Sequence, residues 1–96
     1  MTNVVVLIGA IEKSYFDEEL KICVVELKLR KTVQVSYDVE EFETYKIKLW
    51  KGIYSDVNSL KSFTENLILG VKGRLEIIND SVYICAETVS FLGKNK

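Results

Sequence analysis

A six-residue run near the middle of the chain reads Tyr45-Lys46-Ile47-Lys48-Leu49-Trp50. Successive side chains of a β-strand leave from opposite faces of the sheet. The odd-numbered residues of the run are all apolar and suit a core, whereas the even-numbered residues are two lysines followed by a tryptophan. The run therefore predicts a strand with one buried face and one exposed face.

The exposed face of this strand would place two ammonium groups beside an indole ring. Lysines pair with phosphates, and an exposed tryptophan ring can stack on a base, which is what a sequence-tolerant single-strand binder requires. A half-exposed strand with solubilising lysines, and with Trp50 at the edge of the core or in a subunit interface, explains the same pattern. The strand alone favours this simpler interpretation, so a binding function needs support from the rest of the chain.

Length and composition indicate one globular domain. The chain has 96 residues, of which 48% are hydrophobic and 28% are charged, and these values are typical of a folded domain. No apolar run approaches the roughly 18 residues of a membrane span. The first residues lack the basic region that precedes the apolar part of a signal peptide, so we expect a cytoplasmic protein.

The reactive residue types argue against catalysis. The chain contains no histidine, which removes the commonest general base and the commonest metal ligand. Cys23 and Cys85 lie in apolar runs, and we expect free core thiols rather than a disulfide. Glu40, Glu41 and Glu43 could be interpreted as a metal or acid–base cluster, but the solvated interpretation is favoured. We therefore expect no enzyme activity, no cofactor and no metal site.

Charge is distributed unevenly along the chain. Residues 1–44 carry five basic and nine acidic side chains, a net charge of −4, whereas residues 45–96 carry eight and five, a net charge of +3. The total is only −1, so the protein as a whole is not basic. The excess of positive charge in the second half, which contains Lys46 and Lys48, is a modest indication of a nucleic-acid face.

The remaining sequence predicts four more strands and one helix. We expect strands over residues 3–11, 20–35, 67–78 and 82–92 in addition to the central one, and a helix over residues 55–64 between the third and fourth strands. Ser55 or Asp56 is the expected helix cap. Residues 12–19 are expected to form a polar connection, in which the aromatic pair Tyr15-Phe16 covers one end of the core. Residues 79–81 suit a short hairpin turn.

In the fourth strand, alternation divides the side chains between two faces. Lys72 and Arg74 are expected to point outward, with Ile68 and Glu76. Gly70 and Gly73 permit bending or a close approach of the backbone, as does Gly9 in the first strand. The inward set is expected to be Leu67, Leu69, Val71, Leu75 and Ile77.

Five strands with a helix between the third and fourth follow the order of an OB-fold barrel, a fold whose sheet face and loops bind oligonucleotides. We expect an all-β domain of this kind over residues 1–93, with a short polar end at residues 94–96. Alternation by itself leaves other small barrels almost equally compatible.

Four segments in this order resemble the bacterial single-stranded DNA-binding protein family. They are residues 3–9, 45–50, 71–76 and 85–92, which match the first, third, fourth and fifth strands. The resemblance implies an OB-fold, a homodimer or homotetramer, and binding of single-stranded DNA in replication, recombination or repair. By position, Trp50 falls on the family's stacking aromatic of the third strand.

The resemblance also suggests further contacts. Lys46, Lys48, Lys72 and Arg74 lie on the strands that form the binding surface, as phosphate contacts or as a merely solvated face. Phe42 shares the parity of the exposed residues and could replace an aromatic that the family often has near position 44. Tyr37 and Tyr54 are further candidate binding aromatics, with core or interface positions as the alternative. They complete the candidate set Phe42, Trp50, Lys46, Lys48, Lys72, Arg74, Tyr37 and Tyr54.

The chain also departs from the family pattern. An acidic segment, residues 33–41, replaces a glycine-rich loop, the turn between the last two strands is short, and the acidic C-terminal tail is missing. Each lost base stack would weaken binding by about 1–3 kcal/mol. The chain would therefore be a short, tail-less member without the usual means of recruiting replication or repair proteins. The alternative function is an OB-fold protein-interaction module of the primosomal, replication-restart type with weak DNA binding.

Overall fold

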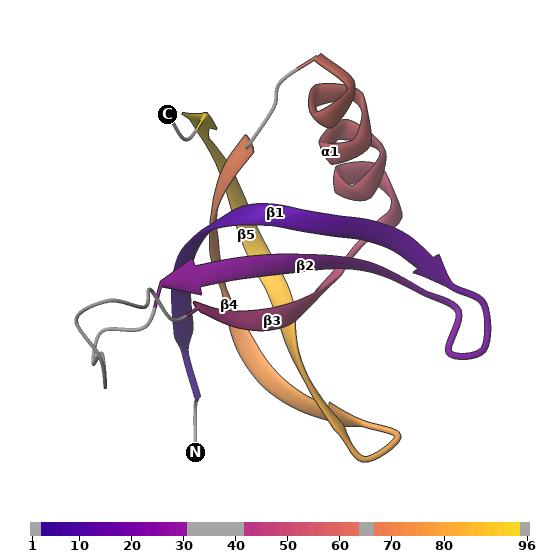
Figure 1. The fold of residues 1–96 in the computed structure, drawn as a ribbon. Helices are drawn as coiled ribbons and strands as arrows, with labels where there is room; N and C mark the ends of the chain where they lie inside the picture. The colour runs from indigo at the N-terminus through magenta and orange to yellow at the C-terminus, as the bar shows by residue number, and fades with distance from the viewer. Residues whose placement is uncertain (1–2, 31–41, 64–66, 95–96) are drawn as a thin grey trace.

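The computed structural model describes residues 3–30, 42–63 and 67–94. Within these residues, five strands form a closed barrel in the order β1-β2-β3-β5-β4, and one helix, α1, follows β3 (Figure 1). This arrangement is the predicted OB-fold. Within the described residues, no helix is both long and apolar enough to cross a membrane. The elements are β1 (Val5–Asp17), β2 (Ile22–Arg30), β3 (Phe42–Leu49), α1 (Lys51–Phe63), β4 (Leu67–Ile78) and β5 (Ser81–Lys94).

The barrel is closed by β1, which pairs first with β4 and then with β2. Its residues 5–10 lie along β4 and its residues 10–17 lie along β2, with an irregularity between Ile11 and Lys13. The prediction of a polar connection over residues 12–19 is therefore wrong, because the second half of β1 is a strand whose polar side chains lie outside the barrel core. At the change of partner, a Cβ on Gly9 would lie 2.9 Å from the Lys28 carbonyl oxygen, so this position needs a glycine.

Helix α1 begins at Lys51, four residues before the predicted start. The Tyr54 amide donates a 3.0 Å hydrogen bond to the Trp50 carbonyl oxygen, which makes Trp50 the residue before the first helical turn. The predicted cap at Ser55 or Asp56 is therefore wrong. No acidic side chain lies in the first turn of α1, so packing must hold the helix in place. The fully buried Val57 provides that packing.

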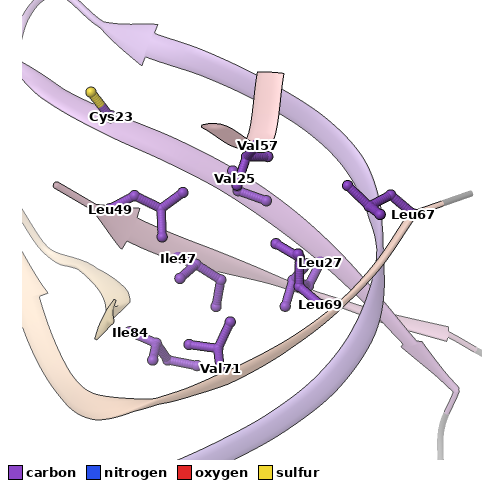
Figure 2. Packing of buried hydrophobic residues seen from close by; sticks show 10 residues of the cluster. All are labelled: Cys23, Val25, Leu27, Ile47, Leu49, Val57, Leu67, Leu69, Val71 and Ile84. Atoms are coloured by element: carbon purple, nitrogen blue, oxygen red, sulfur yellow. The ribbon is translucent and has the colours of Figure 1, made fainter. Parts of the chain in front are cut away.

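The core lies inside the barrel and is closed at one end by α1. Ten buried residues form one cluster, and Figure 2 shows Val57 of α1 lying with the side chains of four strands. β1 adds partly buried side chains at its rim, including Val5, Leu7 and Ile11. The cluster consists of Cys23, Val25, Leu27, Ile47, Leu49, Val57, Leu67, Leu69, Val71 and Ile84.

The hairpin of β4 and β5 extends beyond the barrel (Figure 1). Its turn is as short as predicted, because Asn79 and Asp80 take positive φ values of 50° and 65° between the paired Ile78 and Ser81. Two positive φ values in succession are typical of a hairpin turn that matches the strand twist. The bounds of β4 agree with the prediction.

The predicted inward faces of Leu75 and Ile77 are wrong. These side chains are 47% and 75% exposed. In the described chain, β1 pairs with β4 only as far as Gly73, so Leu75 and Ile77 lie beyond the part of β4 that β1 covers, although Ile84, the β5 partner of Leu75, still belongs to the core. At Gly73 the backbones of β4 and β5 lie so close that an added Cβ would collide with the Cys85 carbonyl oxygen. The predicted close approach at Gly73 is therefore confirmed.

Candidate nucleic-acid interface

The run Tyr45–Trp50 forms the second part of β3 and the residue that follows this strand. Ile47 and Leu49 are buried as predicted, at 0% and 4% exposure, whereas Lys46 and Lys48 leave from the opposite side. Trp50 is 49% exposed and stands between β3 and α1. A Cβ added to Gly52 would lie 3.7 Å from Cδ1 of the Trp50 ring, so the indole lies along the first helical turn. Both lysines and the indole are therefore reachable from outside the barrel.

Strand pairing places a second cation close to this row. Lys48 pairs with Val24 of β2 on one side and with Cys85 of β5 on the other, and Cys85 in turn pairs with Arg74 of β4. Side chains at paired positions lie on the same side of a sheet. Lys48 and Arg74 therefore flank Cys85 on one surface, which we call the outer face. It consists of the outward side chains Val24, Glu26, Lys46, Lys48, Arg74, Glu76, Tyr83 and Cys85, with Trp50 at its end.

A carboxylate lies among the cations of the outer face. The Cys85 thiol donates a 2.8 Å hydrogen bond to Oε2 of Glu76, and Nζ of Lys48 lies 3.9 Å from Oε1 of the same carboxylate. The thiol hydrogen bond, Lys48 and Arg74 together lower the pKa of Glu76. Burial, assisted by Glu76, raises the pKa of Cys85 to about 11. Glu76 is therefore ionised and Cys85 a neutral donor at neutral pH.

Lys46 is held by a different set of neighbours. Its Nζ lies 5.5 Å from the centroid of the Tyr83 ring, within the range of a cation–π contact. Glu26 is the cross-strand neighbour of Lys46. Burial, together with a hydrogen bond to the Glu26 carboxylate, raises the pKa of Tyr15 to about 12. The outer face thus carries both phosphate-binding groups and two carboxylates that offset part of their charge.

The outer face is more tightly packed than strand alternation indicates. Val24 points outward and is nevertheless 0% exposed, and its cross-strand neighbours are Tyr15 and Lys48. Tyr83 is 4% exposed. Neither residue belongs to the main core cluster. Cross-strand register is the signal that identifies such neighbours, and it cannot be read from one strand at a time.

The other predicted site residues have mixed placements. Lys72 and Arg74 are exposed on β4, as expected. Phe42 is the first residue of β3, where its backbone pairs with Arg30. Tyr37 lies outside the described residues. Tyr54 lies on α1, partly buried against the core.

The structure also locates the two cysteine thiols and one residue of the predicted acidic cluster. Cys23 and Cys85 are free, as predicted. Cys23 is in the core, but Cys85 is on the outer face, so its assignment to the core is wrong. Of the acidic cluster only Glu43 is described, and it accepts a hydrogen bond from the Tyr45 hydroxyl. Over the described ranges, no three His, Cys, Asp or Glu side chains are close enough to hold a metal ion.

Comparison with solved structures identifies proteins of the same architecture. The small single-stranded DNA-binding protein of Mycoplasma pneumoniae superposes with a TM-score of 0.72 at 19% identity, covering 100% of this chain and 99% of that one. Plasmodium falciparum SSB, solved in complex with single-stranded DNA, gives a TM-score of 0.63 at 15% identity over 96% of both chains. The mitochondrial protein Rim1 of S. cerevisiae gives 0.61 at 11% identity, over 98% of this chain and 97% of that one.

No protein-family model matches the chain, and no curated protein matches it in sequence. Identities below 25% relate these proteins by fold. At that level the resemblance predicted from the four strand segments is confirmed: the chain has the OB-fold architecture of single-stranded DNA-binding proteins.

Proposed function

We propose that this protein binds single-stranded DNA without catalysis, with bases stacking on Trp50 and phosphates pairing with the cations of the outer face. The observation that carries the proposal is the position of Trp50, which is 49% exposed at the end of the row that holds Lys46 and Lys48. A large exposed aromatic beside cations is the arrangement that sequence-tolerant strand binding requires. The Plasmodium protein of the same fold was solved with single-stranded DNA, which supports this choice of ligand.

The chain offers a direct measurement, because Trp50 is its single tryptophan. Titration with oligo-dT is expected to quench the intrinsic fluorescence, which then reports on Trp50 alone. Trp50→Ala is expected to weaken binding by about 1–3 kcal/mol, or roughly 5- to 150-fold. Because this variant lacks the fluorophore, its affinity is measured by anisotropy of a labelled oligonucleotide.

The charge contribution is tested separately with Lys48→Ala. Loss of one phosphate contact on a single strand reduces the slope of log affinity against log salt by about 0.7. Trp50→Phe retains a ring and should keep most of the affinity, and Lys61→Ala on α1 serves as a charge-matched control. An unquenched tryptophan and unchanged anisotropy at low salt would reject the proposal.

The proposal extends to assembly and setting. We infer that the protein forms a homo-oligomer through the start of β1, where Val4, just before the strand, and Val6 and Ile8 within it are 59%, 66% and 61% exposed. Along residues 5–9, β1 pairs with β4 on one side, and among the described residues β2 pairs with β1 only from Ala10 onward. An apolar, half-paired strand of this kind invites another copy. We place the protein in the cytoplasm, where Cys23 and Cys85 stay reduced, and in replication, recombination or repair.

One observation favours the alternative, a protein-interaction module of the replication-restart type. Glu26 and Glu76 lie among the lysines of the outer face and reduce its positive charge. Such a module would bind a protein partner and leave oligo-dT almost unbound. The titration therefore separates the two functions.

A further inference from the structure

A groove opens beside the outer face, at the end of the barrel where α1 begins. It has a volume of about 460 Å³ and is bordered by Phe16 of β1 and Tyr54 of α1, with Ile22, Cys23 and Leu49 as further apolar lining. Ligand pockets in proteins run from about 300 to 1,000 Å³. We call it the Phe16–Tyr54 groove.

The local fold explains why the groove is open. Phe16 pairs with Cys23, so both side chains point to the inner side of the β1–β2 hairpin. Cys23 reaches the core, but Phe16 lies beyond it and is 48% exposed. Figure 1 shows the hairpin tip and the first turn of α1 on the same side of the barrel. The inner side of the tip therefore faces Tyr54 across open space.

The groove is also strongly basic. Lys21 from the hairpin turn, Lys48 from β3 and Lys51 from the start of α1 all border it. No carboxylate is among the described residues that border the groove, and the nearest recorded carboxylate contact of its cations is that of Lys48, whose Nζ lies 3.9 Å from Oε1 of Glu76. Three cations around an apolar floor with two aromatic rings suit a ligand that is flat, apolar and anionic at its edge.

We propose that the Phe16–Tyr54 groove holds one nucleotide of the single strand bound at the outer face, with its base against the Phe16 and Tyr54 rings and its phosphates at Lys21 and Lys51. This inference rests on the proposed DNA-binding function and adds to it a subsite outside the predicted binding strands. A base supplies the flat apolar part, and the flanking phosphates supply the charge.

Continuity favours the DNA strand over another anionic partner. Lys48 borders both the outer face and the groove, and Lys51 follows directly after Trp50. A strand stacked on Trp50 therefore meets the groove as it leaves the end of β3. An acidic peptide with an aromatic side chain would satisfy the same charges but would have no reason to be continuous with the outer face.

The test compares Phe16→Ala and Lys51→Gln with the unchanged protein over a series of oligo-dT lengths. Both side chains are exposed, so neither substitution removes core packing. For the shortest oligonucleotides that bind, the affinities should coincide with that of the unchanged protein. Above the length at which the strand reaches the groove, Phe16→Ala should bind roughly tenfold more weakly with an unchanged salt slope. Lys51→Gln should reduce that slope by about 0.7.

Matched controls and a direct contact measurement complete the test. Phe91→Ala and Lys61→Gln remove another exposed ring and another α1 cation away from the groove, and they should bind as the unchanged protein does. Oligonucleotides carrying 5-iodouracil should crosslink under ultraviolet light to peptides that contain Phe16 or Tyr54, as well as to Trp50. Phe16→Tyr should retain the affinity lost in Phe16→Ala.

The outcomes separate this inference from the function on which it rests. If Trp50→Ala loses binding while the groove variants match the unchanged protein at every length, the outer face binds DNA and the groove does not. If an acidic peptide of aspartates and phenylalanines shifts the Phe16 and Tyr54 amide resonances and oligo-dT does not, the groove is a protein-binding site. Absence of any oligo-dT binding would overturn both proposals.

Discussion

Glu76 is the residue that most alters the character of the outer face. Its carboxylate is shared between the Cys85 thiol and Lys48, so the cation proposed to bind a phosphate already has an anionic neighbour. Lys48 and Glu76 are 37% and 40% exposed in their side chains, and exposed pairs at such separations are weak. A phosphate can therefore replace the carboxylate at little cost, and Glu76→Gln should raise the affinity for single-stranded DNA.

The hydrogen bond from the Cys85 thiol to Glu76 leads to a prediction about the reactivity of this thiol. Because the thiolate is the nucleophile, a pKa raised from 9.0 to about 11 should make Cys85 alkylate slowly at pH 8 and rapidly only near pH 11. Glu76→Gln should lower the pH at which alkylation reaches half its maximal rate, but only in part, because the thiol remains partly buried. Mass spectrometry of the Cys85 peptide after iodoacetamide treatment measures both effects. In urea the midpoint should return to about 9, and alkylation of the folded protein at the urea rate would contradict the prediction.

The raised pKa of Cys85 also determines how the thiol affects stability. Its protonated form is favoured in the folded state, so the stabilisation is complete below pH 9, the ordinary pKa of the thiol, and is lost as the pH rises to about 11. The pKa of Tyr15 is also raised, from 10.0 to about 12, so Tyr15 adds a further loss of folding stability between these two pH values. Folding stability should therefore decline through this alkaline range.

At the scale of the elements, alternation predicted β3 and the limits of β4, because one side of each strand faces the core and the pattern is plain. It failed in parts of β1 and β4. In β1 beyond Ile11, the strand continues although its side chains are mostly polar. In β4, Leu75 and Ile77 are exposed because they lie beyond the part of the strand that β1 pairs with in the described chain. The start of α1 was missed because neither Trp50 nor Lys51 is a favoured capping residue.

The candidate site was predictable in part for the same reason. The outward directions of Lys46 and Lys48 follow from alternation within one strand, and the exposed Trp50 follows directly after that strand. The neighbours of these lysines, Glu26, Tyr83 and Cys85, can be identified only from the register between strands. This register cannot be read from the sequence.

The unusual start of α1 leads to a prediction at this scale. Lys51 stands in the first turn, where the helix dipole disfavours a cation and favours a carboxylate by about 0.3–1 kcal/mol. Lys51→Glu should therefore raise the free energy of unfolding in urea by about that amount, while weakening the binding of oligo-dT. Lys61 lies in the last turn, so Lys61→Glu should lower stability and leave DNA binding unchanged. Equal stability changes of one sign in both variants would contradict this account.

At the scale of the whole molecule, two groups of exposed apolar side chains are candidates for a contact between copies. One is the stripe formed by Val4, just before β1, and by Val6 and Ile8 within it, and the other is the projecting β4–β5 hairpin with Leu75 and Ile77. A small domain has a limited core and gains stability by association. Within the described residues, β1 also has no strand partner on its second edge along residues 5–9, so we expect its stripe, rather than the hairpin, to form the contact between copies.

Ile8→Lys tests this expectation. Ile8 is 61% exposed, so a lysine fits within one copy, but in a contact between copies it buries a charge. Sedimentation equilibrium should show a smaller mass for Ile8→Lys than for the unchanged protein. Ile77→Lys, at a position that is 75% exposed on the hairpin, should leave the mass unchanged. A monomeric unchanged protein, or dissociation by Ile77→Lys alone, would be incompatible with assembly through β1.

The close packing at Gly73 has a consequence for how this surface can evolve. Position 73 stands between Lys72 and Arg74, and any side chain there would collide with the Cys85 carbonyl oxygen. Any replacement of Gly73 would force β4 away from β5, and this movement would displace the backbone that carries Lys72 and Arg74. Lineages descended from this gene can therefore adjust the two charges one by one, while the residue between them remains glycine.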